Sequence, residues 1–72
     1  MRRAIVKNAD NQRQVEAYLP DNYRVVRQCA MQTAKDPIMF IIEGEDRMGW
    51  TLDDYVIPRL ASGLIFAMEV DA

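Results

Sequence analysis

The sequence predicts one small α+β domain, with its elements in the order strand, helix, strand, strand, helix, strand. The chain has 72 residues and half are hydrophobic, which is too many for a disordered chain and enough for one modest core. Residues 38–42 form a continuous apolar run typical of a central strand, and residues 51–62 carry the capped amphipathic pattern of a helix. This order is that of a compact βαββαβ ferredoxin-like sandwich, an antiparallel four-stranded sheet with two helices on one face. In that fold the first and third strands are central, and the second and fourth are edges.

The first half of the chain predicts a strand, a helix and a polar strand. A short strand is expected over residues 3–7. Asn8 or Asp10 then caps a helix that runs to about Leu19 and ends at the proline that follows. The second strand covers residues 23–32, and its many polar side chains place it at an edge of the sheet.

The second half predicts a hairpin, a buried strand, a loop, a helix and a last strand. Residues 33–36 form the hairpin loop, and the return strand at 38–42 is buried on both faces because its apolar residues do not alternate with polar ones. Residues 43–49 are a polar loop. Residues 64–70 are interpreted as the last strand, although periodicity alone leaves a helix open. The alternative fold is an α+β meander in which this tail is not a fourth strand.

The second helix has the clearest signals in the chain. Thr51 is placed to cap its N-terminus, and an acidic residue three positions later resembles a capping box. Trp50 and Tyr55 have the spacing of a hydrophobic staple, and Gly63 supplies a stop signal. Pro58 lies inside the pattern and predicts a kink, because it lacks the N–H that the preceding turn requires.

This helix and its flanks carry the one resemblance to known proteins. Within residues 42–64, and mainly over 49–63, the sequence resembles small uncharacterised proteins of actinobacteria and their phages. The resemblance covers about a third of the chain. It implies a bacterial or phage accessory protein in the cytosol, and it assigns no activity to any residue.

Charge is unevenly distributed along the chain. Residues 1–28 hold six basic and three acidic side chains, whereas residues 29–72 hold three basic and eight acidic ones, for a net charge of −2. A chain with two oppositely charged halves is suited to self-association or to binding a charged partner.

Composition excludes several classes of enzyme. The sequence contains no His, which is the commonest general base, and Ser62 and Cys29 are its only serine and cysteine. Ser-His and Cys-His catalysis are therefore excluded, and no glycine loop of the phosphate-binding type is present. The lone cysteine permits no internal disulfide, so a reducing, cytoplasmic location is expected, with neither a secretory signal nor a membrane contact.

Two other functions remain as alternatives. One is a Mg²⁺- or Ca²⁺-dependent activity at the acidic loop, for which oxygen ligands are offered by an acidic set, namely Glu43, Glu45, Asp46, Asp53 and Asp54. Nucleic acid is the other alternative partner, through basic residues of the N-terminal half, namely Arg2, Arg3, Lys7, Arg13, Arg24 and Arg27.

The leading interpretation is a non-enzymatic interaction or regulatory module that acts through protein–protein contacts, with a homodimer as the expected state. Two short helices cover one side of a four-stranded sheet, so apolar groups on the other side need a partner. No catalytic residue, cofactor or metal ligand is assigned. The candidate partner-binding residues are Trp50, Tyr55, Tyr23, Arg24 and Arg27.

Overall fold

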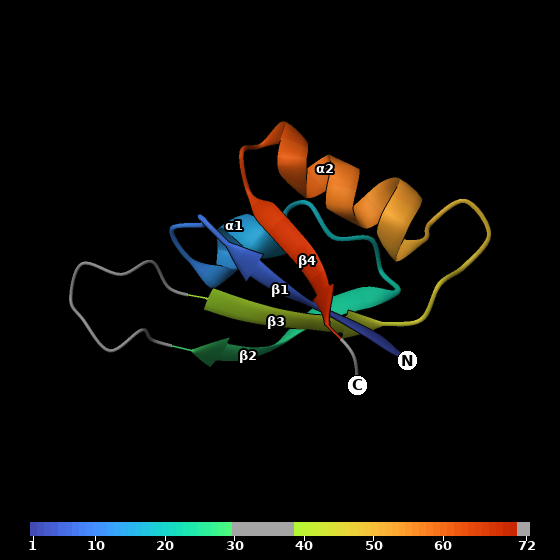
Figure 1. The fold of residues 1–72 in the computed structure, drawn as a ribbon, viewed down its shortest axis with the longest axis horizontal. Helices are drawn as coiled ribbons and strands as arrows, with labels where there is room; N and C mark the ends of the chain where they lie inside the picture. The colour runs from blue at the N-terminus through green and yellow to red at the C-terminus, as the bar shows by residue number, and fades with distance from the viewer. Residues whose placement is uncertain (30–38, 71–72) are drawn as a thin grey trace.

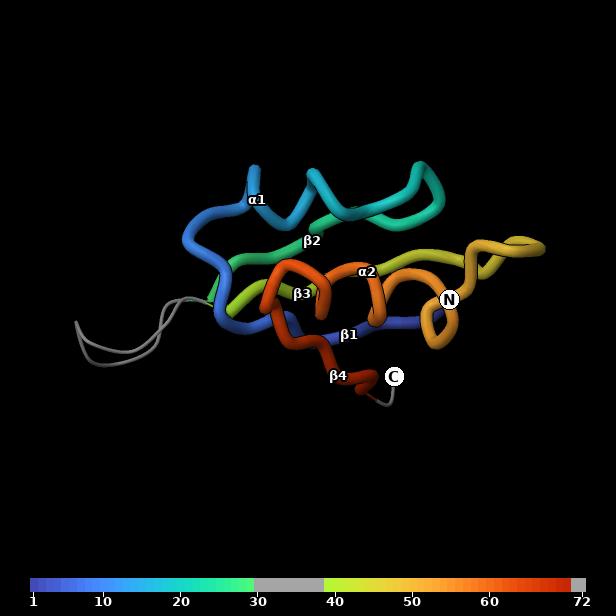
Figure 2. The backbone as a smooth tube through the Cα atoms, turned by 90° about the horizontal axis from the view of Figure 1, so that it is seen from above, coloured from blue at the N-terminus to red at the C-terminus, as the bar shows by residue number. Residues whose placement is uncertain are grey.

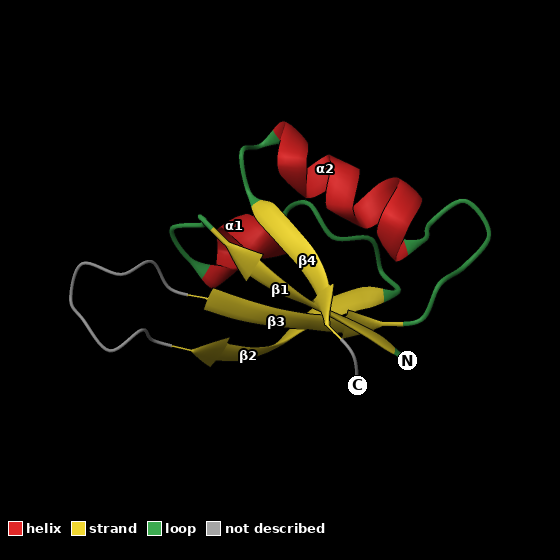
Figure 3. Cartoon of the chain, viewed as in Figure 1, coloured by secondary structure: helices red, strands yellow, loops and turns green. Residues whose placement is uncertain are grey.

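The computed structural model describes residues 1–29 and 39–70 and shows an α+β fold with a four-stranded antiparallel sheet and two helices (Figures 1 and 3). The strands are β1 (Arg2–Lys7), β2 (Tyr23–Cys29), β3 (Met39–Gly44) and β4 (Phe66–Val70). The helices are α1 (Gln12–Glu16) and α2 (Ile57–Ser62), and a π-helical turn, η1 (Leu52–Val56), leads into α2. The strands lie in the order β2-β3-β1-β4, so β1 and β3 are central, as predicted, and Figure 2 shows β2 and β4 on opposite sides of them.

One set of alternating strand residues forms the hydrophobic core. Ala4 and Val6 of β1 and Phe40 and Ile42 of β3 are completely buried, because alternate residues of a strand point to the same face. The same core cluster contains buried side chains from α1, η1, α2 and the turn before β4, namely Val15, Leu52, Val56, Leu60 and Ile65.

The other alternating set forms the opposite face of the sheet, which we call the outer face. Register places its members next to one another across the four strands. They are Arg3, Ile5 and Lys7 of β1, Arg24, Arg27 and Cys29 of β2, Met39, Ile41 and Glu43 of β3, and Phe66, Met68 and Val70 of β4. The predicted burial of residues 38–42 on both faces is therefore only half right, because Met39 and Ile41 are half-buried.

The helix α1 is shorter than predicted and has a different cap. Asn11, not Asn8 or Asp10, is the N-cap, and its side-chain oxygen accepts a hydrogen bond from the Gln14 amide at 2.9 Å. Asn8 instead takes a positive φ of 72° in the bend after β1, and its side-chain amide donates to the Leu64 carbonyl at 2.6 Å. The predicted extension to Leu19 is wrong, because the chain tightens into i→i+3 turns from Tyr18 onward.

The polar strand β2 agrees with prediction within the described residues, whereas its partner β3 continues two residues beyond its predicted end. The strand β2 lies at the sheet edge, as predicted, and has a bulge between Val25 and Arg27. The predicted hairpin loop at 33–36 lies outside the described residues. Glu43 and Gly44, which were predicted to be in a loop, belong to β3, where Gly44 pairs with both neighbouring strands. A side chain at Gly44 would collide with the Asn22 carbonyl and the Tyr23 ring, so glycine permits this close approach.

The capped helix is present, but it consists of two segments. The Thr51 hydroxyl accepts a hydrogen bond from the Asp54 amide at 3.1 Å, which confirms the predicted cap. In place of a simple kink, the turn η1 widens to i→i+5 bonding, with the Val56 amide donating to the Thr51 carbonyl at 3.0 Å. The helix α2 then begins at Ile57, so Pro58 lies in a first turn, where its missing N–H is tolerated.

In the turn from α2 to β4, a leucine and not the glycine takes the left-handed backbone conformation. Gly63 ends α2 as predicted, but it has a negative φ, and Leu64 takes the left-handed conformation with φ 62°. Position 63 still favours glycine, because a side chain there would collide with the Tyr18 hydroxyl and ring unless Tyr18 moved. The tail forms the strand β4, paired with β1, so both the alternative helix and the meander are wrong.

Removing the cap hydroxyl tests the start of the helix. We expect Thr51→Ala to lower the free energy of unfolding by about 1 kcal/mol, because a first-turn amide loses its acceptor. Urea unfolding measures the change. Thr51→Ser keeps a hydroxyl and should retain most of the stability, and equal losses in both variants would contradict the role of the hydroxyl as cap.

Replacing the left-handed leucine tests the turn into β4. Leu64 is exposed, so its side chain contributes little packing, whereas its left-handed backbone costs about 1–2 kcal/mol. We expect Leu64→Gly to raise the free energy of unfolding by up to about 1 kcal/mol after the greater chain entropy of glycine is included. Leu64→Ala keeps the backbone cost and is the control; thermal unfolding showing the same gain for both variants would contradict the explanation.

Candidate functional site

The outer face of the sheet carries large apolar side chains that the core does not cover. Phe66 and Met68 are 65% and 67% exposed, although they lie in a regular strand. Met68 pairs with Ile5 and Ile5 pairs with Ile41, so these side chains form a row across three strands. A shallow cavity of about 340 Å³ opens beside them, lined by Ile5, Lys7, Phe66, Ala67 and Met68. This apolar row and its cavity are the candidate contact surface.

Basic side chains surround the apolar row. Four of the six basic residues predicted to form a patch lie on the outer face, namely Arg3, Lys7, Arg24 and Arg27. Within the described residues, Glu43 is the only acidic side chain on this face, and Arg3 Nε donates to its carboxylate at 2.8 Å. The strand register therefore brings together on one surface basic side chains that are up to 24 positions apart in the sequence. The surface that results is apolar and strongly basic.

The acidic side chains gather around a different arginine, at the end of the sheet where η1 begins. Arg2 donates to Asp46 at 2.6 Å, to Asp53 at 2.9 Å and to Glu69 at 2.7 Å and 2.8 Å. Asp46 also accepts hydrogen bonds from the Tyr23 hydroxyl at 2.6 Å and from the Leu52 amide at 2.9 Å. We call Arg2 and its three carboxylate partners, together with Tyr23, the Arg2 network.

The hydrogen bonds of the Arg2 network shift the pKa values of Arg2, Tyr23, Asp46 and Glu69. The Tyr23 hydroxyl and Arg2 lower the pKa of Asp46, and Arg2 lowers the pKa of Glu69. Burial and the bond to Asp46 raise the pKa of Tyr23, and the three carboxylates raise the pKa of Arg2. Each of these four shifts favours the protonation state present at neutral pH, so the hydrogen bonds of the network are strongest there.

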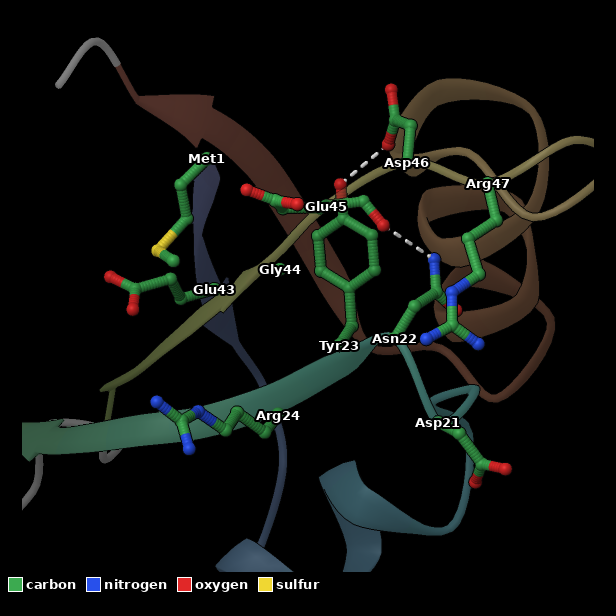
Figure 4. A pocket seen from close by; sticks show the side chains of 10 residues that line it. All are labelled: Met1, Asp21, Asn22, Tyr23, Arg24, Glu43, Gly44, Glu45, Asp46 and Arg47. Atoms are coloured by element: carbon green, nitrogen blue, oxygen red, sulfur yellow. Dashed lines mark hydrogen bonds between the residues drawn. The ribbon is translucent and has the colours of Figure 1, made fainter.

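A second cavity, of about 350 Å³, lies beside the Arg2 network (Figure 4). Figure 4 shows the Tyr23 ring at its centre, with its hydroxyl directed at Asp46 and the Asn22 amide directed at the Glu45 backbone. The Asn22 amide also donates to the Trp50 carbonyl at 2.9 Å. These polar groups hold the loop at residues 45–50 against the turn before β2, so the cavity is a product of loop anchoring.

Three members of the predicted acidic set are divided between two arginines. Asp46 and Asp53 bind Arg2, whereas Glu43 lies on the outer face with Arg3. Across residues 1–29 and 39–70, no three His, Cys, Asp or Glu side chains are grouped closely enough to hold a metal ion.

The five predicted partner-binding residues fall into three places. Tyr23 is only 4% exposed and its ring belongs to the core, so it presents no surface for stacking. Trp50 and Tyr55 pack against each other with ring centroids 6.2 Å apart, as the staple predicts, and Trp50 stays 43% exposed. Arg24 and Arg27 are exposed on β2 and belong to the outer face.

The residues that define the outer face best have no predicted function. Phe66 and Met68 lie in a predicted strand, but they are not among the predicted partner-binding residues. The sequence does contain a signal for this face. Residues 64–68 are all apolar, whereas apolar and polar residues should alternate in an edge strand with one solvated face. Arg2 was counted with the basic patch, but it lies in the Arg2 network.

Comparison with protein-family models, with curated proteins and with solved structures finds no match to this chain. No helix within the described part of the chain combines the length and apolar character needed to cross a bilayer. The site must therefore be interpreted from its own chemistry.

Acid should weaken the fold through the Arg2 network. The pKa values of Asp46 and Glu69 are lower in the folded chain, so the unfolded chain binds protons first as the pH falls below about 4.5, the ordinary pKa of a glutamate. The free energy of unfolding should fall over this range. In Arg2→Gln the fall should be shallower, because the carboxylates lose their main cationic partner.

Urea unfolding between pH 7 and pH 3 measures this effect. Arg13→Gln removes an equal charge from the exposed surface of α1 and is the control. We expect Arg13→Gln to keep the steep acid dependence of the original chain. The same dependence in Arg2→Gln would contradict the assignment of the acid response to the network.

Proposed function

We propose that this chain is a non-enzymatic interaction module that acts through protein–protein contacts at the outer face of its sheet. We also propose that it is a βαββαβ ferredoxin-like sandwich with both helices on the inner face. Support comes from the strand order and from the core cluster, in which buried residues of α1, η1 and α2 join only the inner-face residues of the strands. A bacterial or phage accessory protein is the setting that the resemblance over residues 42–64 implies.

The observation that carries this proposal is the exposure of Phe66 and Met68 beside the cavity at Ile5. Leaving apolar area in water forfeits about 25 cal/mol per Å², which matters in a domain whose total stability is only about 5–15 kcal/mol. Exposed apolar clusters of this kind mark contact sites more often than they occur by accident.

The charge of the outer face indicates which kind of partner surface can bind to it. The outer face holds four basic side chains and one acidic side chain, and that acid is already paired with Arg3. A second copy stacked face to face would bring like charges together, which costs free energy. A partner with apolar side chains flanked by acidic ones satisfies both features of the face. We therefore propose an acidic, amphipathic protein segment as the partner of this face.

The residues available for covalent chemistry support a non-enzymatic function. The Ser62 hydroxyl donates to the Arg59 carbonyl at 2.6 Å within α2, and the sequence has no histidine to activate it. Cys29 is half-buried on β2, where it pairs with Met39. Among residues 1–29 and 39–70, neither side chain has the neighbour that an activated nucleophile requires.

Single-stranded nucleic acid is the second candidate partner, because the structure gathers Arg3, Lys7, Arg24 and Arg27 on one face. Sequence-tolerant binding of single strands combines such a basic surface with aromatic rings on which bases stack. Phe66 is the single aromatic residue that the described strands place on this face, since Phe40 and Tyr23 are buried. The aliphatic remainder of the face favours a protein partner.

A peptide probe tests the proposed partner. We would use a labelled amphipathic helical peptide of about 18 residues, with a leucine stripe and glutamates, and a matched peptide with lysines in place of the glutamates. Fluorescence polarisation should show tighter binding of the glutamate peptide and a loss of affinity as salt rises from about 50 to 200 mM.

Charge reversals locate the binding site. Arg27→Glu on the outer face should weaken binding of the glutamate peptide by about tenfold, whereas Arg13→Glu on α1 should change it little. Equal effects of the two reversals, or equal affinity for the lysine peptide, would contradict the proposal. An oligothymidine that binds more tightly than the glutamate peptide would favour the nucleic-acid alternative.

A further inference from the structure

The two edges of the sheet differ in how they are protected from pairing with another chain. The edge strand β2 has a bulge at Val26 and carries Arg24 and Arg27, and both features discourage edge-to-edge pairing. The edge strand β4 has neither feature. All five of its residues pair with β1 in one unbroken register, and Glu69 is its only charged residue.

The unpaired side of β4 is a template for another strand. In the described part of the chain the sheet ends at β4, so one row of its backbone donors and acceptors has no strand partner. Regular backbone, apolar side chains and a lack of prolines are the conditions under which strand addition occurs. What remains to be specified is the strand that fits.

We propose that β4 pairs antiparallel with β4 of a second copy, about a two-fold axis at Met68, so that two four-stranded sheets become one of eight strands. This proposal concerns the hydrogen-bonding edge and does not depend on the partner proposed for the outer face. The expected homodimer would thus form through an edge, and not by stacking of two outer faces.

Self-complementarity of β4 selects this register. With Met68 on the axis, Phe66 lies opposite Val70 of the second copy, and all five residues of each strand are paired. Apolar side chains on the outer face then meet apolar side chains. A two-fold interface requires one patch that complements itself, and β4 satisfies that condition in this register.

The position of Glu69 argues against the neighbouring registers. With Met68 on the axis, Glu69 lies opposite Ala67 of the second copy, and Arg2 of its own chain still binds its carboxylate. An axis at Glu69 would place two carboxylates opposite each other. An axis at Ala67 would place Glu69 opposite Ile65, which is completely buried in the core of its own chain.

Sedimentation velocity at micromolar concentrations tests the dimer. Met68→Arg puts like charges opposite each other on the axis, and we expect it to raise the dimer dissociation constant by at least about tenfold. Met48→Arg makes the same change at a fully exposed loop position and should leave the dimer intact. A chain that is monomeric throughout this range, or equal weakening by both variants, would overturn the proposal.

Cysteine cross-linking tests the register. In a Cys29→Ser background, Met68→Cys should form a disulfide-linked dimer under mild oxidation, because the axis places position 68 opposite itself. Phe66→Cys alone should not cross-link, whereas a mixture of the Phe66→Cys and Val70→Cys chains should. Efficient cross-linking of Phe66→Cys alone would overturn this register.

The two proposals can fail separately. Peptide binding is measured on the unaltered chain, and sedimentation of the same chain measures the dimer. Peptide binding by a chain that is monomeric at micromolar concentrations would support the outer-face partner and reject the edge interface. A dimer that forms through β4 without any peptide binding would support the edge interface and reject the proposed outer-face partner.

Discussion

The Arg2 network is the interaction on which the arrangement of the chain depends most. It joins the start of β1, the end of β4, the first turn of η1 and the loop before it through one guanidinium group. Asp46 adds the start of β2 through the Tyr23 hydroxyl and caps the Leu52 amide. Each of these elements is too short to be stable alone, since isolated helices below about 12 residues are marginal in water. Their relative placement therefore depends on long-range contacts of this kind.

Local signals in the sequence were enough to predict the elements and the central position of β1 and β3. The Thr51 cap, the Trp50–Tyr55 contact and the edge position of β2 were all predictable, because each depends on residues close together in the chain. The cap of α1 was not, since Asn8, Asp10 and Asn11 all have suitable side chains. Tertiary contacts determine which of them caps the helix, because the Asn8 side chain donates a hydrogen bond to the Leu64 carbonyl, 56 residues away.

The candidate site was harder to predict, because it depends on strand register. Arg3, Arg24 and Arg27 were recognised as basic, but nothing local shows that they share a face with Phe66 and Met68. Arg2 precedes Arg3 by one position and points to the opposite side of the strand, where it binds three carboxylates. Alternation along β1 thus separates two adjacent arginines into a structural role and a surface role, and charge counting cannot make that distinction.

The composition of β4 shows where the requirements of folding and of contact conflict. Folding requires only one apolar face from an edge strand, and Ile65 and Ala67 already supply it. Phe66 and Met68 on the opposite face, and the strained Leu64 before them, reduce stability without filling the core. The other edge strand, β2, is protected from pairing with another chain by a bulge and two arginines, and β4 has neither feature. The stability lost at β4 is most simply explained by contacts that form there with another chain. Pairing through β4 would make the apolar rows of two copies continuous. Arg24 and Arg27 of each copy would then lie at the far edges of the joined sheet.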